Sequence, residues 1–595
     1  MNRPTCPGLW PSSLTLVLVG IIAGCSSQST TTTASPVSFA NNPCGAPGTL
    51  ALAVNTTALV DCSNGGTTLT LAGNGASYVV VPQFATSQGP DQFVPYALSS
   101  GNLASASITA RRVGALRMAM GSSPTTAPLV EPGARQLQWQ QQVDRILRSR
   151  GAADAATGNF SFAQARLRAP SLLDAAPPDV GSVRAFHVLS SFTATGSTYA
   201  TVNATLSYAG TNILLYLDNN APASGFTPQQ LQAFGAYFDQ TLYAITANAF
   251  GTPSDIDQNG HVIVVLSPVV NADTPAATCA TNGYVAGFFD TGDFSGPSNP
   301  NSNQGEIFYA IVPDPNAVFS CAHTVTALGS DLPGTFMHEL QHLIAFSQHV
   351  VIHGQSSYAS WLDEGLSILA EELGSLYFEA KCPPPSCRSS ASQLFPDSAQ
   401  GFVQNFLYDS YQYALVPDTV SLTLHDDSED GFSWRGGDWL LVRWLGDQFG
   451  NQVFRSLETG PGDGIADVVA AAGQPFPNLM GNFGLALYTD SLPGLPRTTA
   501  PAAARFVTRN VRQLWARLYA TSTSTDIPTP SPVQLYPITT DTSSSILDPG
   551  TMSFYRLDTP ANVAAVTIRF SAPGGGPLSA AWHPQMSIYR LPPGQ

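Results

Sequence analysis

The sequence predicts an α+β protein in which helices pack against one side of a sheet, with smaller β-rich segments on either side. Runs of β-branched and aromatic residues, such as 77–84 (SYVVVPQF), are separated by Gly and Asn and read as strands. Residues 227–250 start with a Thr-Pro pair and carry apolar side chains at helical spacing. From residue 185 the order is strands, helix, two strands and a helix with two histidines, which is the pattern of an α+β domain.

The composition excludes one class of partner. Of the 595 residues, 43% are hydrophobic and only 11% are charged, whereas a soluble domain carries roughly 25% charged residues. The formal net charge is −16 and no basic stripe is present, so nucleic acid is excluded because phosphate binding needs clustered Lys and Arg. Low charge with much Gly, Pro, Ser and Thr is typical of an exported, loop-rich protein.

The first residues predict export and a membrane anchor. Residues 14–22 are nine apolar residues, too few for the roughly 20 that span a bilayer but suited to a secretory signal. They lead into IAGCSS, which resembles a bacterial lipobox and implies cleavage after residue 24 and a lipid on Cys25. Residues 25–38 would be a Ser/Thr-rich tether. The expected location is the outer membrane or the cell surface, with or without later release; a plain signal peptide is the alternative.

The cysteines also indicate an oxidising compartment. Eight are present; Cys6 would leave with the signal peptide and Cys25 would carry the lipid. Six cysteines allow about fifteen pairings, so the sequence does not fix the disulfides. A nearest-neighbour arrangement is predicted, with the pairs Cys44–Cys62, Cys279–Cys321 and Cys382–Cys387.

Changes in composition and in strand or helix patterns divide the chain into segments. Residues 39–110 predict a small N-terminal β-domain, and 530–595 predict a small C-terminal β-domain. Residues 111–184 read as a linker or a propeptide-like region with one helix at 136–150. The large α+β domain is expected over 185–525.

The segment 338–342 reads HELQH. On a helix, His338 and His342 are four residues apart and share a face, where two imidazoles can bind one Zn²⁺. Glu339 could then take a proton from a water on the metal. The alternative is that the two histidines are only the polar edge of an amphipathic helix.

A catalytic zinc ion needs a third protein ligand. In metzincins it is the last His of HExxHxxGxxH, but Ala345 and Gln348 occupy the required Gly and His positions here, so that pattern is excluded. Glu364 lies 22 residues after His342 on a second predicted helix, and it is the predicted third ligand.

The segments HELQHLIAF and WLDEGLSILAEEL resemble the gluzincin clan of zinc metallopeptidases, and in particular the hyicolysin family. The likeness covers roughly residues 185–455, with Asp363 where that family's pattern has Asn. It implies a zincin-like catalytic domain over 185–525, zinc as cofactor, protein or peptide substrates, His338, His342 and Glu364 as ligands, and Glu339 as the general base of an endopeptidase. Glu371, seven residues after Glu364, would orient a zinc-bound imidazole.

Two further sites are left open. The donor to the oxyanion, a Tyr in related enzymes, is not assigned, because Ser433 or Trp434 stands at its place; the candidates are His425, Tyr408, Tyr411 and Tyr413. The segment DIDQNG could hold a structural Ca²⁺ on Asp255, Asp257 and Asn259, although an ordinary Asn-Gly turn is the simpler interpretation.

Two other functions remain as alternatives at this stage. One is a binding or adhesion lipoprotein on a zincin scaffold that no longer cleaves. The other is a zinc aminopeptidase. The intact His338, Glu339 and His342 favour catalysis over the first alternative.

Overall fold

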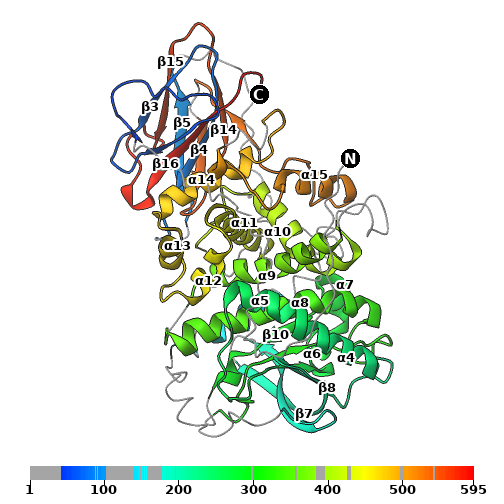
Figure 1. Cartoon of the computed structure of the whole chain (residues 1–595). Coiled ribbons are helices and arrows are strands. Elements are labelled where there is room, and N and C mark those ends of the chain that lie inside the picture. Colours follow the sequence, from blue (N-terminus) through cyan, green and yellow to red (C-terminus); the bar gives the residue numbers. More distant parts are fainter. Residues whose placement is uncertain are drawn as a thin grey trace, which may run out of the picture.

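The computed structural model describes residues 42–87, 89, 92–101, 140, 142–147, 149–151, 153, 156, 177–193, 196–295, 299–355, 358–382, 395–424, 431–495, 501–540 and 543–595. It shows a mixed α+β protein with a β-sandwich at one end, helices in the middle and a helix-covered sheet at the other end (Figure 1). The predicted signal peptide, Cys25 and the tether lie outside the described residues, as do Cys387 and His425. No helix in the described ranges has the length and apolar character needed to cross a membrane.

A six-stranded sheet carries the first half of the large domain. Its order is β10-β11-β9-β8-β7-β6. β8, β9 and β11 run parallel, and the other pairs are antiparallel. Every residue of β9 is buried, as expected of an apolar run covered on both faces. The short strand β10 is at the edge of the sheet. The bounds are β6 Val183–Thr193, β7 Gly196–Ala209, β8 Ile213–Asp218, β9 Val262–Leu266, β10 Gly287–Phe289 and β11 Ile307–Ala310.

The helix predicted from the Thr227-Pro228 pair is present. The hydroxyl of Thr227 accepts a hydrogen bond from the backbone N–H of Gln230, and the Gln230 side chain accepts one from the N–H of Thr227, so both ends of a capping box are made. The helix has three parts, α4 (Pro228–Tyr237), the π-helical turn η1 (Phe238–Leu242) and α5 (Tyr243–Phe250). Short helices α6 (Pro268–Ala272), α7 (Ala276–Asn282) and η2 (Thr291–Phe294) connect the following strands.

Two long helices follow, and the first of them packs on β10 and β11 of this sheet. α8 (Val325–Phe346) begins at Thr324, whose side chain caps the helix by accepting from the N–H of Ala327. α8 continues into the π-helix η3 (Ser347–Ile352), and α9 (Ser360–Lys381) packs against it. Every residue of α8 from Phe336 onward is buried, because the sheet lies on one side and α9 on the other.

Two glycines let the following helices approach closely. α10 (Gln404–Leu415) packs on α11 (Gly431–Phe449), and a Cβ on Gly436 would lie only 2.0 Å from the carbonyl oxygen of Asp409. A Cβ on Gly365 of α9 would lie 3.1 Å from the backbone of Asp438 on α11. These contacts bring α9, α10 and α11 together around one point. The remaining helices are η4 (Asp397–Phe402), α12 (Gln452–Thr459), α13 (Ile465–Ala472), α14 (Phe476–Thr489), η5 (Ala502–Ala504) and α15 (Val511–Thr521).

The two predicted terminal β-domains are one unit. Strands from both chain ends alternate in a six-stranded sheet, β1-β2-β16-β4-β14-β12, and in a four-stranded sheet, β13-β5-β15-β3. Most neighbouring strands in these sheets come from opposite ends of the chain, so neither segment forms its sheets without the other. The N-terminal strands are β1 Asn42–Pro43, β2 Thr57–Asp61, β3 Thr68–Ala72, β4 Ser77–Phe84 and β5 Val94–Ser100. The C-terminal strands are β12 Tyr536–Pro537, β13 Ser543–Leu547, β14 Tyr555–Asp558, β15 Ala565–Ser571 and β16 Pro584–Arg590, with the turn η6 at Ala580–Trp582.

Side chains join the sandwich to the helical part. The amide of Gln585 donates to the side-chain oxygen of Gln83 at 2.7 Å and to the carbonyl of Pro477 at 2.9 Å. Gln83 in turn donates to the carbonyl of Met480 on α14 at 3.2 Å. Two of the predicted disulfides, Cys44–Cys62 and Cys279–Cys321, are confirmed. The third prediction, Cys382–Cys387, involves a residue outside the described ranges.

Candidate metal centre

Helix α8 places the two histidines of the HELQH segment on one face. The Nε2 atoms of His338 and His342 lie 3.1 Å apart, and both side chains are buried. The helical spacing brings the rings together, and the dense packing of α8 holds them there. Glu339 is also buried and lies beside the pair.

Helix α9 brings a carboxylate to the same point. Glu364, with no exposed surface, has Oε1 at 3.7 Å from Nε2 of His342 and Oε2 at 4.0 Å from Nε2 of His338. One ligand atom from each of the three residues lies within 4.8 Å of the others. Tetrahedral ligands at about 2.1 Å from a zinc ion are about 3.4 Å apart. The nitrogen and oxygen donors present therefore fit such an ion after small movements of the side chains.

The outer nitrogen of each imidazole faces a carboxylate. Nδ1 of His338 is hydrogen-bonded to Oε1 of Glu371 at 2.7 Å, and the amide of Asn405 donates to both oxygens of Glu371. Nδ1 of His342 lies 2.9 Å from Oδ2 of Asp363. Such contacts fix the ring orientation and make the inner nitrogen a better metal ligand. Glu371 occupies the position that the family resemblance implies, and Asp363 is an additional partner.

The electrostatics of the group follow from its burial. Burial and the neighbouring His342 lower the pKa of His338 to about 3, which keeps this imidazole neutral. Burial alone would lower the pKa of His342, but the carboxylates of Asp363, Glu364 and Glu339 outweigh it and raise the pKa to about 10. Burial and the nearby Asp144 raise the pKa of Glu339 to about 8. The excess of carboxylates over cations is the environment that a divalent metal ion neutralises.

Arg435 is a part of the site that sequence reasoning missed. It comes from α11, is 2% exposed, and its Nε lies 3.4 Å from Oε2 of Glu364 and 3.8 Å from Oδ2 of Asp409. Its side chain lines the same hollow as His338 and Glu339. No motif marks this residue, although it directly follows Trp434, one of the two positions at which the sequence comparison looked for an oxyanion donor.

The helix around residue 144, from the segment predicted as a linker or propeptide, also reaches the site. Gln140 lines one hollow with His338 and Glu339. Asp144 lines a second hollow with Glu339 and His342, and its Oδ2 lies 3.6 Å from Nη1 of Arg435. The weak helical signal over 136–150 carried no hint of this position.

The predicted oxyanion donors are not brought to the group of His338, His342 and Glu364 in the residues that the structure describes. The hydroxyl of Tyr411 donates to the carbonyl of Thr529 at 2.6 Å and accepts from its N–H, so it holds a loop. Tyr413 packs beside Gly437, and Tyr408 contacts Phe432. None of the three lines either hollow beside Glu339. His425 lies outside the described residues.

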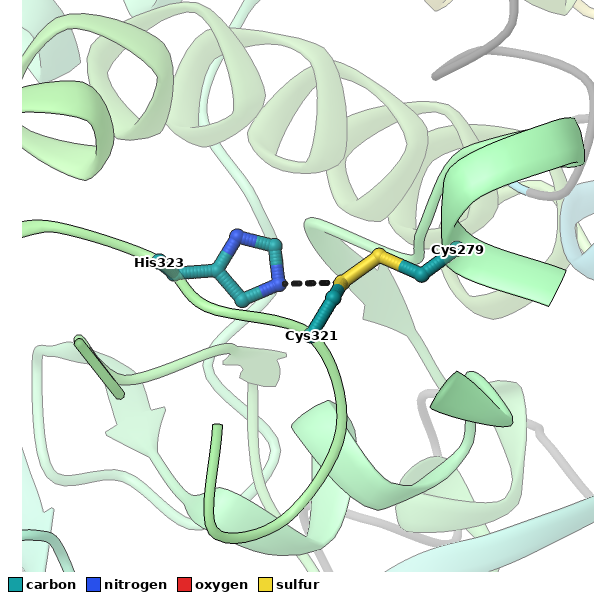
Figure 2. A group of neighbouring side chains, drawn as sticks. All are labelled: Cys279, Cys321 and His323. Atoms are coloured by element: carbon teal, nitrogen blue, oxygen red, sulfur yellow. Dashed lines mark hydrogen bonds between the residues drawn. A yellow bond between two sulfur atoms is a disulfide. The ribbon is translucent and has the colours of Figure 1, made fainter. Parts of the chain in front are cut away.

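A second group of ligand-type side chains is formed by Cys279, Cys321 and His323 (Figure 2). The two cysteines are joined in a disulfide, and Nε2 of His323 lies 3.2 Å from Sγ of Cys321. Metal binding needs thiolates, and a disulfide has none to offer. The group is therefore a structural disulfide cross-link with the His323 side chain packed against it. A third group, of carboxylates, lies near residue 255.

The chain was also compared with known proteins. No family model matches it. Over 179 residues, it is 25% identical to the neutral metalloprotease ShpI of Staphylococcus hyicus, a stretch that is 29% of this chain and 36% of that relative. The similarity suggests a metalloprotease. The chain spans only about a third of the relative's length, so the similarity is distant and partial. Together with the buried group of His338, His342 and Glu364, it supports metal-dependent peptidase chemistry at this site.

Proposed function

We propose that this protein is a zinc-dependent endopeptidase of the gluzincin type, related to the hyicolysin family, that acts on proteins or peptides. The observation that carries the proposal is the buried group of His338, His342 and Glu364, with Glu339 beside it. His338 and His342 would hold the ion through Nε2, and Glu364 through a carboxylate oxygen. A zinc ion held there would lower the pKa of a water molecule, so that the water can lose a proton and attack a peptide carbonyl near neutral pH.

Residues of this chain would carry out proton transfer, orient the two imidazoles and stabilise the developing charge. Glu339 takes the proton of the attacking water and passes it to the leaving amine, which needs a carboxylate in the hollow. Glu371 and Asp363 hold the two imidazoles in orientation. Arg435 is a cation in the wall of the hollow, so we assign to it the stabilisation of the negative charge that develops on the carbonyl oxygen. This charge is conventionally met by a tyrosine or histidine in such enzymes.

The proposal includes export and attachment to a bacterial membrane. The lipobox-like IAGCSS and the polar tract after it support an exported protein held on a bacterial membrane through Cys25. Both confirmed disulfides suit an oxidising compartment.

The first test combines metal analysis with cleavage of casein by protein that starts after Cys25, beside the variant Glu339→Gln. About one zinc per chain is expected in both proteins. Activity should fall by several orders of magnitude in the variant and in chelator. Zinc without cleavage by the wild type, or by a variant in which Gln140 and Asp144 beside Glu339 are replaced, would point instead to a non-catalytic binding protein. Comparing N-terminally blocked substrates with free dipeptide amides separates an endopeptidase from an aminopeptidase.

A further inference from the structure

Three carboxylates gather at one end of the large sheet, away from the metal centre. Asp255 and Asp257 lie in the loop between α5 and β9, and Glu306 directly precedes β11. β9 and β11 are parallel neighbours, with Ile263 opposite Ile307. The residues that precede the two strands therefore meet at the same end of the sheet. One oxygen from each carboxylate lies within 4.8 Å of the others.

The carboxylate of Glu306 is the observation that points to a ligand. It is 1% exposed. Its Oε1 accepts hydrogen bonds from the hydroxyl of Ser254 at 2.7 Å and from the N–H of Ile256 at 2.9 Å. Its Oε2 is buried and accepts no hydrogen bond from the residues that the structure describes. A buried carboxylate oxygen without a partner is costly, and a cation on it would remove that cost.

No positive side chain within the described ranges forms an ion pair with the three carboxylates. Arg184 acts on Asp257 at longer range, and its Nη2 donates to the carbonyl of Asn303 at 2.8 Å. Burial, together with the neighbouring acids, raises the pKa of Glu306 to about 8 and that of Asp257 to about 6. These are the signs of gathered anions whose charge is not balanced by the protein.

We propose that Asp255, Asp257 and Glu306 bind one calcium ion. Only oxygen donors are offered, which selects a hard cation. Calcium–oxygen distances of about 2.4 Å allow ligands up to about 4.8 Å apart, and one oxygen of each carboxylate lies within that limit of the others. Asp255 is exposed, so water completes the coordination on that side.

The ligand set differs from the one expected from the sequence. Asn259 is occupied elsewhere, because its amide donates to Oδ2 of Asp257 at 2.7 Å and its Oδ1 accepts from the N–H of His261 at 2.6 Å. Glu306, 49 residues after Asp257, takes its place. The site also touches the end of the histidine-bearing helix, since the hydroxyl of Ser254 lies 3.1 Å from that of Ser347 in η3. A bound ion would therefore stabilise the loop, the sheet edge and η3 together.

The test follows thermal unfolding of the Glu339→Gln protein, which cannot digest itself. Unfolding is measured with and without about 5 mM CaCl₂. Calcium should raise the Tm by several degrees, and Glu306→Gln should abolish the rise. If Glu306→Gln does not fold, the exposed Asp255→Asn should weaken calcium binding about tenfold in calorimetry. The proposal is overturned if calcium raises the Tm equally in the parent Glu339→Gln protein and in the proteins that also carry these substitutions.

Asp273→Asn is the matched control. Asp273 is a half-buried acid whose two side-chain oxygens are buried and accept no hydrogen bond from the described residues, but it lies outside the carboxylate group. Its variant should keep the full calcium response. All these readouts are independent of peptide cleavage, so they stand or fall separately from the proposed peptidase activity.

A second, independent observation concerns the helix around residue 144. Its inward residues Gln140, Val143, Asp144, Leu147 and Gly151 follow helical spacing. Val143 and Leu147 are buried in the main apolar core, and a Cβ on Gly151 would lie 3.0 Å from the side chain of Thr291. This packing fixes the helix across both hollows beside Glu339.

Gln140 pairs with the edge of the sheet in the way that a peptide group does. Its amide donates to the carbonyl of Gly287 at 2.7 Å, and its oxygen accepts from the N–H of Ala286 at 2.8 Å. Gly287 begins β10, the edge strand, whose free side is the place where an extended peptide adds to a sheet. Asp144 meanwhile lines one hollow with Glu339, and its Oδ2 lies 3.6 Å from Nη1 of Arg435; the proposed reaction needs both groups.

We infer that this helix is a latch that keeps the site latent, an inference that rests on the proposed peptidase function. Gln140 occupies the edge where substrate would pair, and Asp144 lies beside Glu339 in one hollow and pairs with Arg435. Displacing the helix would expose the free side of β10 and would separate Arg435 from Asp144.

The test uses the double variant Gln140→Ala with Asp144→Asn in the full exported chain, beside Gln142→Ala, an exposed position on the same helix. The double variant should cleave a blocked peptide at least about tenfold faster at unchanged zinc content, and the control should not. In the Glu339→Gln background, it should also bind a blocked peptide hydroxamate about tenfold more tightly. Equal affinity in the two proteins overturns the latch even if no form cleaves, whereas loss of zinc from all forms would remove the peptidase proposal itself.

Discussion

Nδ1 of His338 on α8 is hydrogen-bonded to Oε1 of Glu371 on α9 at 2.7 Å, while Nε2 of the same ring faces His342 and Glu364. One carboxylate thus fixes which imidazole nitrogen is turned toward the metal-binding group. Asn405 donates to both oxygens of Glu371 and holds that carboxylate in turn. The chain of contacts runs from α10 through α9 to α8.

Replacing this carboxylate should weaken metal binding. We expect Glu371→Gln to lower zinc affinity about 10–100-fold, because the amide supports the imidazole less well than a carboxylate does. Competition with a chromophoric chelator measures the affinity directly. Glu379→Gln is the control, since Glu379 lies two turns further along α9 and pairs with Arg509. An unchanged affinity in Glu371→Gln would show that the contact is only structural.

The grouping of His338, His342 and Glu364 could be anticipated because its information is local. The two histidines are one helical turn apart, and Glu364 lies on the next helix of the chain. Arg435 and Asp144 could not be anticipated in this way. They reach the site from α11 and from the helix around residue 144, and their positions depend on how distant helices pack.

The same limit explains the β-sandwich. The run of β-branched and aromatic residues at 77–84 predicted β4 correctly, but not that it pairs with residues about 500 positions away in β16. The hydroxyls of Tyr96 and Tyr555, for example, lie 2.7 Å apart across this unit. Which strand pairs with which depends on the closing of a very long loop, and a sequence pattern carries no record of that.

Arg435 should act on turnover rather than on metal binding. In Arg435→Lys the positive charge beside Glu364 is kept, but the planar group that lines the hollow is lost. We expect kcat to fall by about 10²-fold with zinc content and KM near those of the wild type. Arg443→Lys is the matched control, because this buried arginine of α11 faces Glu372 and Asp447 instead. A loss confined to KM, or an equal loss in both variants, would contradict the assigned role.

A separate buried network should carry much of the stability. Nε of Arg509 lies 2.8 Å from Oε1 of Glu372, which is fully buried, and Trp439 donates to Oε2 of the same carboxylate at 3.1 Å. Arg509→Met removes the nearer of the two cations at Glu372 and leaves Arg443 at 3.6 Å, so the free energy of unfolding should fall by about 3 kcal/mol or more. Urea unfolding in the Glu339→Gln background measures it. Arg556→Met, which breaks the exposed pair with Asp558, should cost about 1 kcal/mol or less.

The pH dependence of stability has a specific contributor in Asp273, at the end of α6. Burial raises its pKa to about 8, whereas in the unfolded chain the value is about 3.9. Between these two values the folded protein holds a proton that the unfolded chain has lost, so this residue lowers stability as pH rises from about 4 to 8 and adds no further change above that. Asp273→Asn should therefore match the wild type near pH 4 and exceed its Tm by about 2 °C or more at pH 8.

Asp558 provides the opposite case in the same experiment. Burial alone would raise its pKa, but hydrogen bonds from Arg556 and Ser77 outweigh burial and lower it. Its contribution to stability is present at neutral pH and is lost as pH falls through the lowered value. Asp558→Asn should thus lose Tm at pH 8 and little in strong acid, opposite in sign to Asp273→Asn. Scanning calorimetry of both variants across this range checks the two signs together, and parallel pH profiles for the two would contradict the burial argument for Asp273.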